Sequence, residues 1–144
     1  MLAVSREMVE RMGILCMVYR IDNDPAILKR IDAELRRVCD FSDWNNQHFL
    51  DVAEMSFAVA LAIDWAGKWL PKSTVDQAKI ALVEKGLIPS FNENEIRMFW
   101  INSYNNWNAV CHSGMIAAAL MAFDVNPELA TKTIHRALDK LPNS

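Results

Sequence analysis

The residues best suited to chemistry are three asparagines and a histidine that lie close together: Asn105, Asn106, Asn108 and His112. They fall at the predicted start of an apolar helix over residues 107–123. Amide hydrogens at a helix N-terminus favour a carboxylate there. His112 follows Asn108 by four residues, so both lie on one helix face. The spacing suits a carboxylate-binding pocket, and the alternative is an asparagine N-cap above a hydrogen-bonded core histidine, with Trp107 as packing.

A second polar group consists of His48, Asp51 and Glu54, spaced three residues apart at the start of a predicted helix over 49–69. These side chains are either metal ligands or a polar stripe that lines a cavity. A metal site in a helical protein usually needs a fuller ligand set drawn from two helices. We therefore expect no metal and no other cofactor. Because buried carboxylates are costly when unpaired, we expect Asp51 and Glu54 to have partners such as His48, Arg97 or Tyr104.

The elements that position these residues are predicted to be helices throughout. Residues 2–19, 49–69 and 107–123 are apolar on most sides, which is typical of buried helices. Each is followed by an amphipathic stretch that shows helical periodicity. The pattern predicts an all-α fold of about three antiparallel αα-hairpins in a single domain that covers residues 1–144.

Two of the predicted hairpins have the same turn sequence between their helices, Asp-x-Asx-Pro, at 22–25 and at 124–127. An aspartate can cap a helix start, and proline suits the first helical position because it has no amide hydrogen to lose. Repetition of a helix–turn–helix unit indicates hairpins that stack into a solenoid or close into a toroid.

Composition excludes several classes of protein. With 144 residues, 52% of them hydrophobic and 23% charged, the chain suits one globular domain and not a disordered one. A net charge of −3 and the lack of a Lys/Arg run argue against a nucleic-acid partner. The longest continuous runs of mostly apolar residues, 55–63 and 113–123, are too short for a bilayer span, so we expect no membrane partner.

The cysteines and the N-terminal sequence bear on the cellular compartment. Cys16, Cys39 and Cys111 form no CxxC pair and lie in apolar contexts, which predicts buried free thiols. The first residues contain no apolar run of signal-peptide length. As written, the chain is expected to be cytoplasmic.

Several segments together resemble the heparinase II/III-like polysaccharide lyases, which include alginate and oligoalginate lyases. The strings that carry the resemblance are DWNNQHFLDVAEM at 43–55 with AIDW at 62–65, ALVEKGL at 81–87, NNWNAVCHSGM at 105–115 and NPELA at 126–130. The opening AVSR at 3–6 with MVYR at 17–20 is also similar to the first helix of that family. The resemblance covers nearly the whole chain.

This resemblance implies an (α/α) toroid that acts with β domains to cleave uronate-containing polysaccharides by β-elimination. It implies that Asn106 and His112 neutralise the uronate carboxylate. Residues expected to bind substrate are Trp44, His48, Tyr104, Asn105, Trp107 and Asn108. Among the aromatics, Trp44 is expected to stack on a sugar because it lies in a polar loop, whereas Trp65 and Trp69 have the spacing of core residues.

The resemblance reaches only part of the toroid. The family usually places its acid–base tyrosine further along the chain and adds β domains, and its members are usually periplasmic or secreted. We therefore expect a fragment of a lyase toroid that binds acidic polysaccharide or oligosaccharide and is inactive alone.

The competing interpretation is an α-hairpin repeat module that binds a protein or peptide through its concave face. An exposed stripe of Leu, Met and Phe on that face would favour it. Since an open arc of hairpins leaves apolar surface exposed at its ends, we also expect a homo-oligomer.

Overall fold

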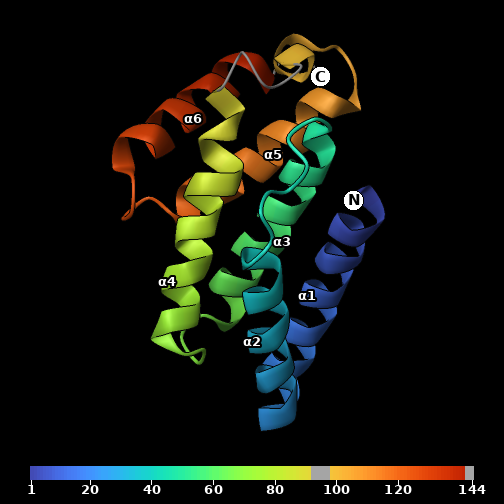
Figure 1. Cartoon of the computed structure of the whole chain (residues 1–144), viewed down its shortest axis with the longest axis vertical. Coiled ribbons are helices and arrows are strands. Elements are labelled where there is room, and N and C mark those ends of the chain that lie inside the picture. Colours follow the sequence, from blue (N-terminus) through green and yellow to red (C-terminus); the bar gives the residue numbers. More distant parts are fainter. Residues whose placement is uncertain (92–97, 142–144) are drawn as a thin grey trace.

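The computed structural model describes residues 1–91 and 98–141, and within them every regular element is helical. Figure 1 shows the six α-helices, which are α1 Leu2–Asp22, α2 Pro25–Cys39, α3 Phe49–Ala66, α4 Lys72–Ala81, α5 Asn106–Met121 and α6 Pro127–Lys140. A π-helical turn, Leu82–Leu87, continues α4, and two 3-10 turns follow at Pro89–Phe91 and Met98–Asn102. Among these described helices, none is both long and apolar enough to cross a bilayer. The all-α prediction is confirmed.

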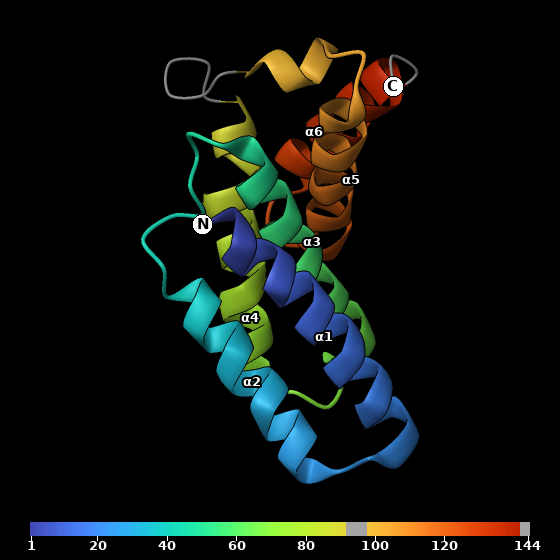
Figure 2. The ribbon, with the colours of Figure 1, turned by 90° about the vertical axis from the view of Figure 1, so that its right-hand side faces the viewer.

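Helix α3 occupies the centre of the molecule (Figures 1 and 2). It packs along α1 on one side and along α5 on the other. Helix α2 packs against α1 and α4, and α6 packs against α5. The π turn after α4 contacts both α3 and α5, so it closes the space behind them. The arrangement places α1, α3 and α5 together, with α2, α4 and α6 covering one side of them.

The composition of α3 explains its central place. Thirteen of its 18 residues are buried, and five of those are alanines: Ala53, Ala58, Ala60, Ala62 and Ala66. Small side chains let neighbouring helices approach closely, while Val52, Met55 and Val59 fill the space between them. The most exposed side chains of α3, Phe57 and Asp64, mark the one side that no helix covers.

The helix starts predicted at the two Asp-x-Asx-Pro turns are correct. The Asp24 carboxylate accepts a hydrogen bond from the Ala26 amide at 2.8 Å, and Pro25 occupies the first position of α2. At the second turn the cap is Asn126, whose side-chain oxygen accepts from the Leu129 amide at 3.0 Å. In each case the side chain satisfies a backbone donor that the helix leaves free.

The sequence Ser73-Thr-Val-Asp76 has the spacing of a capping box, but it does not act as one. Helix α4 begins at Lys72 and has no side-chain cap. The Ser73 hydroxyl instead accepts a hydrogen bond from Arg36 at 3.0 Å, and the Thr74 hydroxyl donates to Asp32. The two hydroxyls therefore hold α4 against α2 and do not close their own helix end.

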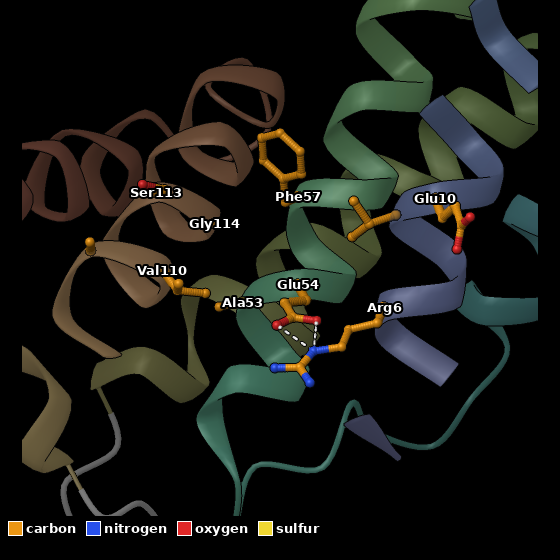
Figure 3. Close-up of a pocket in the computed structure, with 10 residues that line it drawn as sticks. Arg6, Glu10, Ala53, Glu54, Phe57, Val110, Ser113 and Gly114 are labelled. Atoms are coloured by element: carbon orange, nitrogen blue, oxygen red, sulfur yellow. Dashed lines mark hydrogen bonds and ion pairs between the residues drawn. The ribbon is translucent and has the colours of Figure 1, made fainter. Parts of the chain in front are cut away.

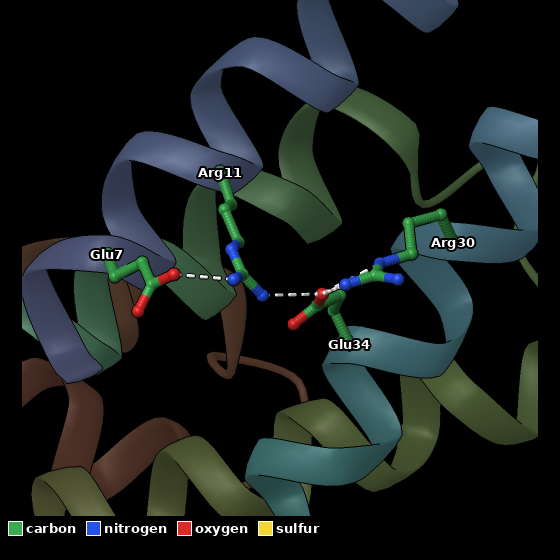
Figure 4. Close-up of polar contacts among 4 residues, drawn as sticks. All are labelled: Glu7, Arg11, Arg30 and Glu34. Atoms are coloured by element: carbon green, nitrogen blue, oxygen red, sulfur yellow. Dashed lines mark hydrogen bonds and ion pairs between the residues drawn. The ribbon is translucent and has the colours of Figure 1, made fainter.

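Ion pairs join α1 to both of its neighbours. Figure 3 shows Arg6 of α1 pairing with Glu54 of α3 at 3.2 Å. Figure 4 shows Glu34 of α2, which accepts from Arg11 of α1 at 2.9 Å and from Arg30 of its own helix. The Glu34 carboxylate, followed by that of Glu7, raises the pKa of the Arg11 guanidinium. Exposed pairs of this kind fix how α1 lies on its neighbours more than they add stability.

The contact between α3 and α5 generates a testable prediction. A Cβ added to Gly114 would overlap the backbone carbonyl of Ala53 and lie 2.8 Å from its Cα, and a backbone cannot give way as a side chain can. We expect Gly114→Ala to lower the free energy of unfolding by about 1–3 kcal/mol, the usual cost of overpacking. Urea denaturation followed by circular dichroism measures it.

The matched control is Gly13→Ala in the interior of α1. A Cβ there would meet only the Leu61 side chain, at 4.0 Å. Because alanine favours a helix interior over glycine, this variant should gain about 0.5–1 kcal/mol. Equal effects of the two substitutions would contradict the close contact at Gly114.

Candidate functional site

Helices α3 and α5 begin side by side. His48 is the N-cap residue of α3, and Trp107 is the second residue of α5. Their rings meet edge to face with centroids 5.0 Å apart, and the Phe99 ring lies 4.9 Å from Trp107 on the preceding turn. We call this surface the α3–α5 edge, and its members are His48, Phe99, Tyr104, Asn105, Asn106 and Trp107. The structure therefore brings five of the eight predicted site residues together and adds Phe99.

Most of the α3–α5 edge is open to solvent. Tyr104 is 85% exposed and Phe99 53%, and Asn105 and Asn106 are exposed as well. The Asn105 side-chain oxygen accepts from the Trp107 amide at 3.0 Å and from the Ser103 hydroxyl at 2.7 Å. Asn105 is thus the N-cap of α5, as the structural alternative for this motif proposed.

His112 and Asn108 lie beneath this surface and are fully buried. The Asn108 amide donates to the Ile101 carbonyl at 2.9 Å and to the Trp100 carbonyl at 3.3 Å. The His112 Nε2 lies 3.4 Å from the same Ile101 carbonyl. The prediction that His112 and Asn106 converge on one cavity is therefore wrong. The turn Met98–Asn102 packs on α5. Its backbone carbonyls form hydrogen bonds with the two polar side chains that were expected to face a ligand.

Burial also decides the charge of His112. Loss of water around the ring lowers its pKa more than the Ile101 carbonyl raises it, and the nearby Arg136 lowers it further. Near neutral pH the imidazole is therefore uncharged. Its place in the structure is that of an anchor for the 98–102 turn.

Trp44, predicted to stack on a sugar, is fully buried. Its indole N–H donates to the Val38 carbonyl at the end of α2, at 3.0 Å, and its ring lies against Gly86. The loop folds inward because the indole finds both a hydrogen-bond acceptor and apolar contacts there. On the α3–α5 edge the exposed aromatic side chains are those of Phe99 and Tyr104 instead.

Phe99 was missed because it is adjacent to a second aromatic residue, Trp100, in a stretch without clear periodicity. Trp100 is fully buried and stacks on Phe49 with centroids 4.7 Å apart. It also meets the His112 ring edge to face at 4.9 Å. Since neighbouring side chains in a tight turn point in different directions, burial of Trp100 leaves Phe99 exposed. The adjacent pair of aromatics was the available signal.

The polar stripe at the start of α3 separates into two pairs. Asp51 is 1% exposed and accepts a hydrogen bond from the Asn45 side-chain amide, and its Oδ2 lies 3.6 Å from His48 Nδ1. Glu54 pairs instead with Arg6. Of the expected partners, His48 thus lies beside Asp51, whereas Arg97 falls outside the described residues. Within the described ranges no group of three or more His, Cys, Asp or Glu could hold a metal ion.

The two helix starts differ in charge. The first turn of α3 already contains Asp51, whereas the first turn of α5 contains no acidic residue. Because the amide hydrogens of a helix start attract anions, and a resident carboxylate weakens that attraction, an anion at the α3–α5 edge is better placed at α5. Asn106 is the first residue of that helix and is exposed.

A second feature is an apolar groove that α1, α3 and α5 line together (Figure 3). It encloses about 450 Å³ between Val9, Ala53, Phe57, Ala109 and Val110, with the Arg6–Glu54 pair at its rim. A smaller hollow of about 260 Å³ continues along α3 past Phe57, lined also by Leu61, Leu120 and Met121. The groove follows the side of α3 that no other helix covers.

Comparison with known proteins leaves the family open. No protein-family model matches the chain, and no curated protein matches its sequence. Function must therefore be argued from the residues and their geometry.

The buried histidine generates a pH prediction. Because burial lowers the pKa of His112, the unfolded chain binds this proton more readily than the folded protein does. As the pH falls below about 6.5, the ordinary pKa of histidine, unfolding takes up a proton and the folded state loses stability, by at most about 1.4 kcal/mol per pH unit. Urea titrations between pH 7.5 and 5.5 measure this slope.

His112→Gln removes the titrating group and should flatten the slope. The comparison variant is His135→Gln, which removes an exposed histidine of α6 and leaves the buried one in place. A His112→Gln protein with the wild-type slope would show that other groups carry the pH dependence.

Proposed function

We propose that this chain is the helical part of a polysaccharide lyase that acts by β-elimination, and that the α3–α5 edge binds a uronate sugar. The observation that carries the proposal is the meeting of two helix starts, marked by the 5.0 Å contact between His48 and Trp107. That meeting gathers exposed aromatic rings, amide side chains and an imidazole on one surface. These are the groups that an acidic sugar requires.

Each part of the α3–α5 edge matches a feature of a uronate. The faces of Tyr104 and Phe99 offer apolar area against which a sugar ring can stack. The start of α5 and the exposed Asn106 amide offer donors to the carboxylate. Neutralising that carboxylate is the first requirement of β-elimination, because it makes the C5 proton acidic. Asn108 and His112 support this surface from below by holding the 98–102 turn.

The toroid belongs to the same proposal. Helices α1, α3 and α5 pack together in chain order, and α2, α4 and α6 lie to one side of them. We propose that they form three antiparallel hairpins, α1–α2, α3–α4 and α5–α6, which make up an arc of an (α/α) toroid. In such an arc the starts of the inner helices open toward the same cleft, which agrees with the position of the α3–α5 edge.

A second candidate function is an interaction module for a protein or peptide, and the apolar groove favours it. Phe57, Leu61, Leu120 and Met121 form the kind of Phe, Leu and Met stripe that docks an apolar helix. We further propose that a second copy of the chain covers this stripe in solution. Two further apolar side chains are exposed nearby in the chain order of the helices: Ile21 near the end of α1 is 71% exposed, and Phe123, just after α5, is 48% exposed. Apolar patches of this extent favour association.

The proposed function predicts that the chain binds a uronate oligosaccharide. Titration with alginate tetrasaccharide should change the tryptophan fluorescence, because Trp107 is the tryptophan that belongs to the α3–α5 edge. Trp107→Phe should remove the change, and Asn106→Ala should weaken binding by about 1–2 kcal/mol, or about 5–30-fold in Kd. The measurement is of binding and not of turnover, because the proposal gives this chain the substrate-holding part of the site.

Two controls accompany this titration. Maltotetraose has no carboxylate and should produce no response. Trp44→Phe should leave the sugar response in place, since Trp44 is buried and bonded to Val38. A wild-type protein that responds to no uronate would refute the proposed substrate class.

The proposed contact between two copies of the chain predicts self-association in solution. Sedimentation velocity at micromolar concentration should show a dimer or larger species for the wild-type chain. Phe57→Asp places a charge in the middle of the apolar stripe and should shift the protein to the monomer. Leu138→Asp is the matched control, because Leu138 is 66% exposed on α6, away from the stripe, and its substitution should leave association intact. A wild-type monomer, or dissociation by Leu138→Asp alone, would contradict a second copy on this stripe.

A further inference from the structure

The three histidines of the chain occupy different environments. His112 is fully buried and His135 is exposed on α6. Only His48 belongs to the α3–α5 edge, where 40% of its side chain is exposed. It is therefore the imidazole that a bound sugar could reach.

His48 is held on two sides. Its Nδ1 is buried and lies 3.6 Å from Oδ2 of Asp51. The Trp107 ring meets the imidazole edge to face at 74°, which limits rotation of the ring. The separation from Asp51 is longer than a hydrogen bond, and such contacts in empty binding sites often shorten when the ligand binds.

Asp51 is itself fixed in place. It is 1% exposed, and the Asn45 side-chain amide donates to the same Oδ2 that faces His48. Asn45 adopts a left-handed backbone with φ of 64°, a conformation that asparagine tolerates better than most residues. The other oxygen, Oδ1, is also buried and has no hydrogen-bond partner within the described part of the chain. A buried carboxylate with spare acceptor capacity beside an imidazole favours a proton on the nitrogen that faces it.

We propose that Asp51 is a positioning residue that keeps His48 in the Nδ1–H form, so that Nε2 faces the α3–α5 edge as a hydrogen-bond acceptor for a hydroxyl of the uronate sugar. The identity of the ligand rests on the proposed function, whereas the orientation of the ring does not. His48, and not His112 as the sequence predicted, is then the imidazole that contacts the sugar.

A purely structural role for Asp51 predicts something different. If Asp51 served only to tie Asn45 to the start of α3, its removal would lower stability and leave the tautomer of His48 unchanged. Measurement of the His48 tautomer therefore distinguishes the positioning role of Asp51 from the purely structural one.

The experiment uses the full chain labelled with ¹⁵N, and two-bond proton–nitrogen spectra of the imidazoles at pH 8. His48 should be in the Nδ1–H form, whereas the exposed His135 should show the tautomer mixture of a free imidazole. Asp51→Leu removes the acceptor at similar volume and should return His48 to the mixture. Asp51→Asn keeps an oxygen acceptor and should retain the Nδ1–H form.

The tautomer of His48 in the wild-type protein tests the proposal by itself, even if Asp51→Leu fails to fold. An Nε2–H form of His48 in the wild-type protein would overturn the proposal. So would an unchanged Nδ1–H form in a folded Asp51→Leu protein.

Addition of alginate tetrasaccharide then tests the ligand. The His48 Nε2 resonance should shift, while those of His112 and His135 should not. Shifts at Trp107 and Asn106 without any at His48 Nε2 would overturn this inference and leave the proposed function standing. No shift anywhere on the α3–α5 edge would overturn the proposed function, and with it the sugar as the ligand of His48.

Discussion

The close approach of α3 and α5 at Ala53 and Gly114 is the contact on which the rest of the structure depends. A side chain at Gly114 would collide with the α3 backbone, so the two helices can lie this close only because glycine stands there. The distance between the helices sets the distance between their first turns. His48 and Trp107 are therefore in contact, and the 98–102 turn packs against α5. Every group on the α3–α5 edge takes its place from that one spacing.

The need to satisfy buried polar groups decides which side chains remain free for a ligand. The turn Met98–Asn102 brings the Trp100 ring into the core, and its backbone carbonyls enter with it. Those carbonyls require donors, and Asn108 and His112 supply them. A side chain that anchors a buried carbonyl is not available to a substrate, because leaving that carbonyl unpaired costs about 1–3 kcal/mol. The same turn that removes Asn108 and His112 from solvent exposes Phe99 and Tyr104.

Two distinct surfaces of α3 thus have different chemistry. Its start is polar and aromatic, and it meets α5 at the surface proposed to bind a uronate. Its uncovered side is apolar, runs past Phe57 and Leu61, and is proposed to meet another copy of the chain. A sugar is recognised by directed hydrogen bonds and ring stacking, whereas a helix surface is recognised by apolar area.

The sequence by itself determined the all-α fold, the helix positions to within a few residues, the Asp24 cap and the buried thiols, because local periodicity and turn chemistry decide these features. It also placed His48 beside Asp51 and the asparagine motif at the start of α5. Only the tertiary structure decided which polar side chains point outward. In helices that are apolar on most sides, periodicity marks no solvent face, so the direction of His112 and Asn108 depended on the 98–102 turn that covers them. Likewise, Trp44 turned inward because a carbonyl of α2 and the small Gly86 lay within reach, and local sequence carries no record of such contacts.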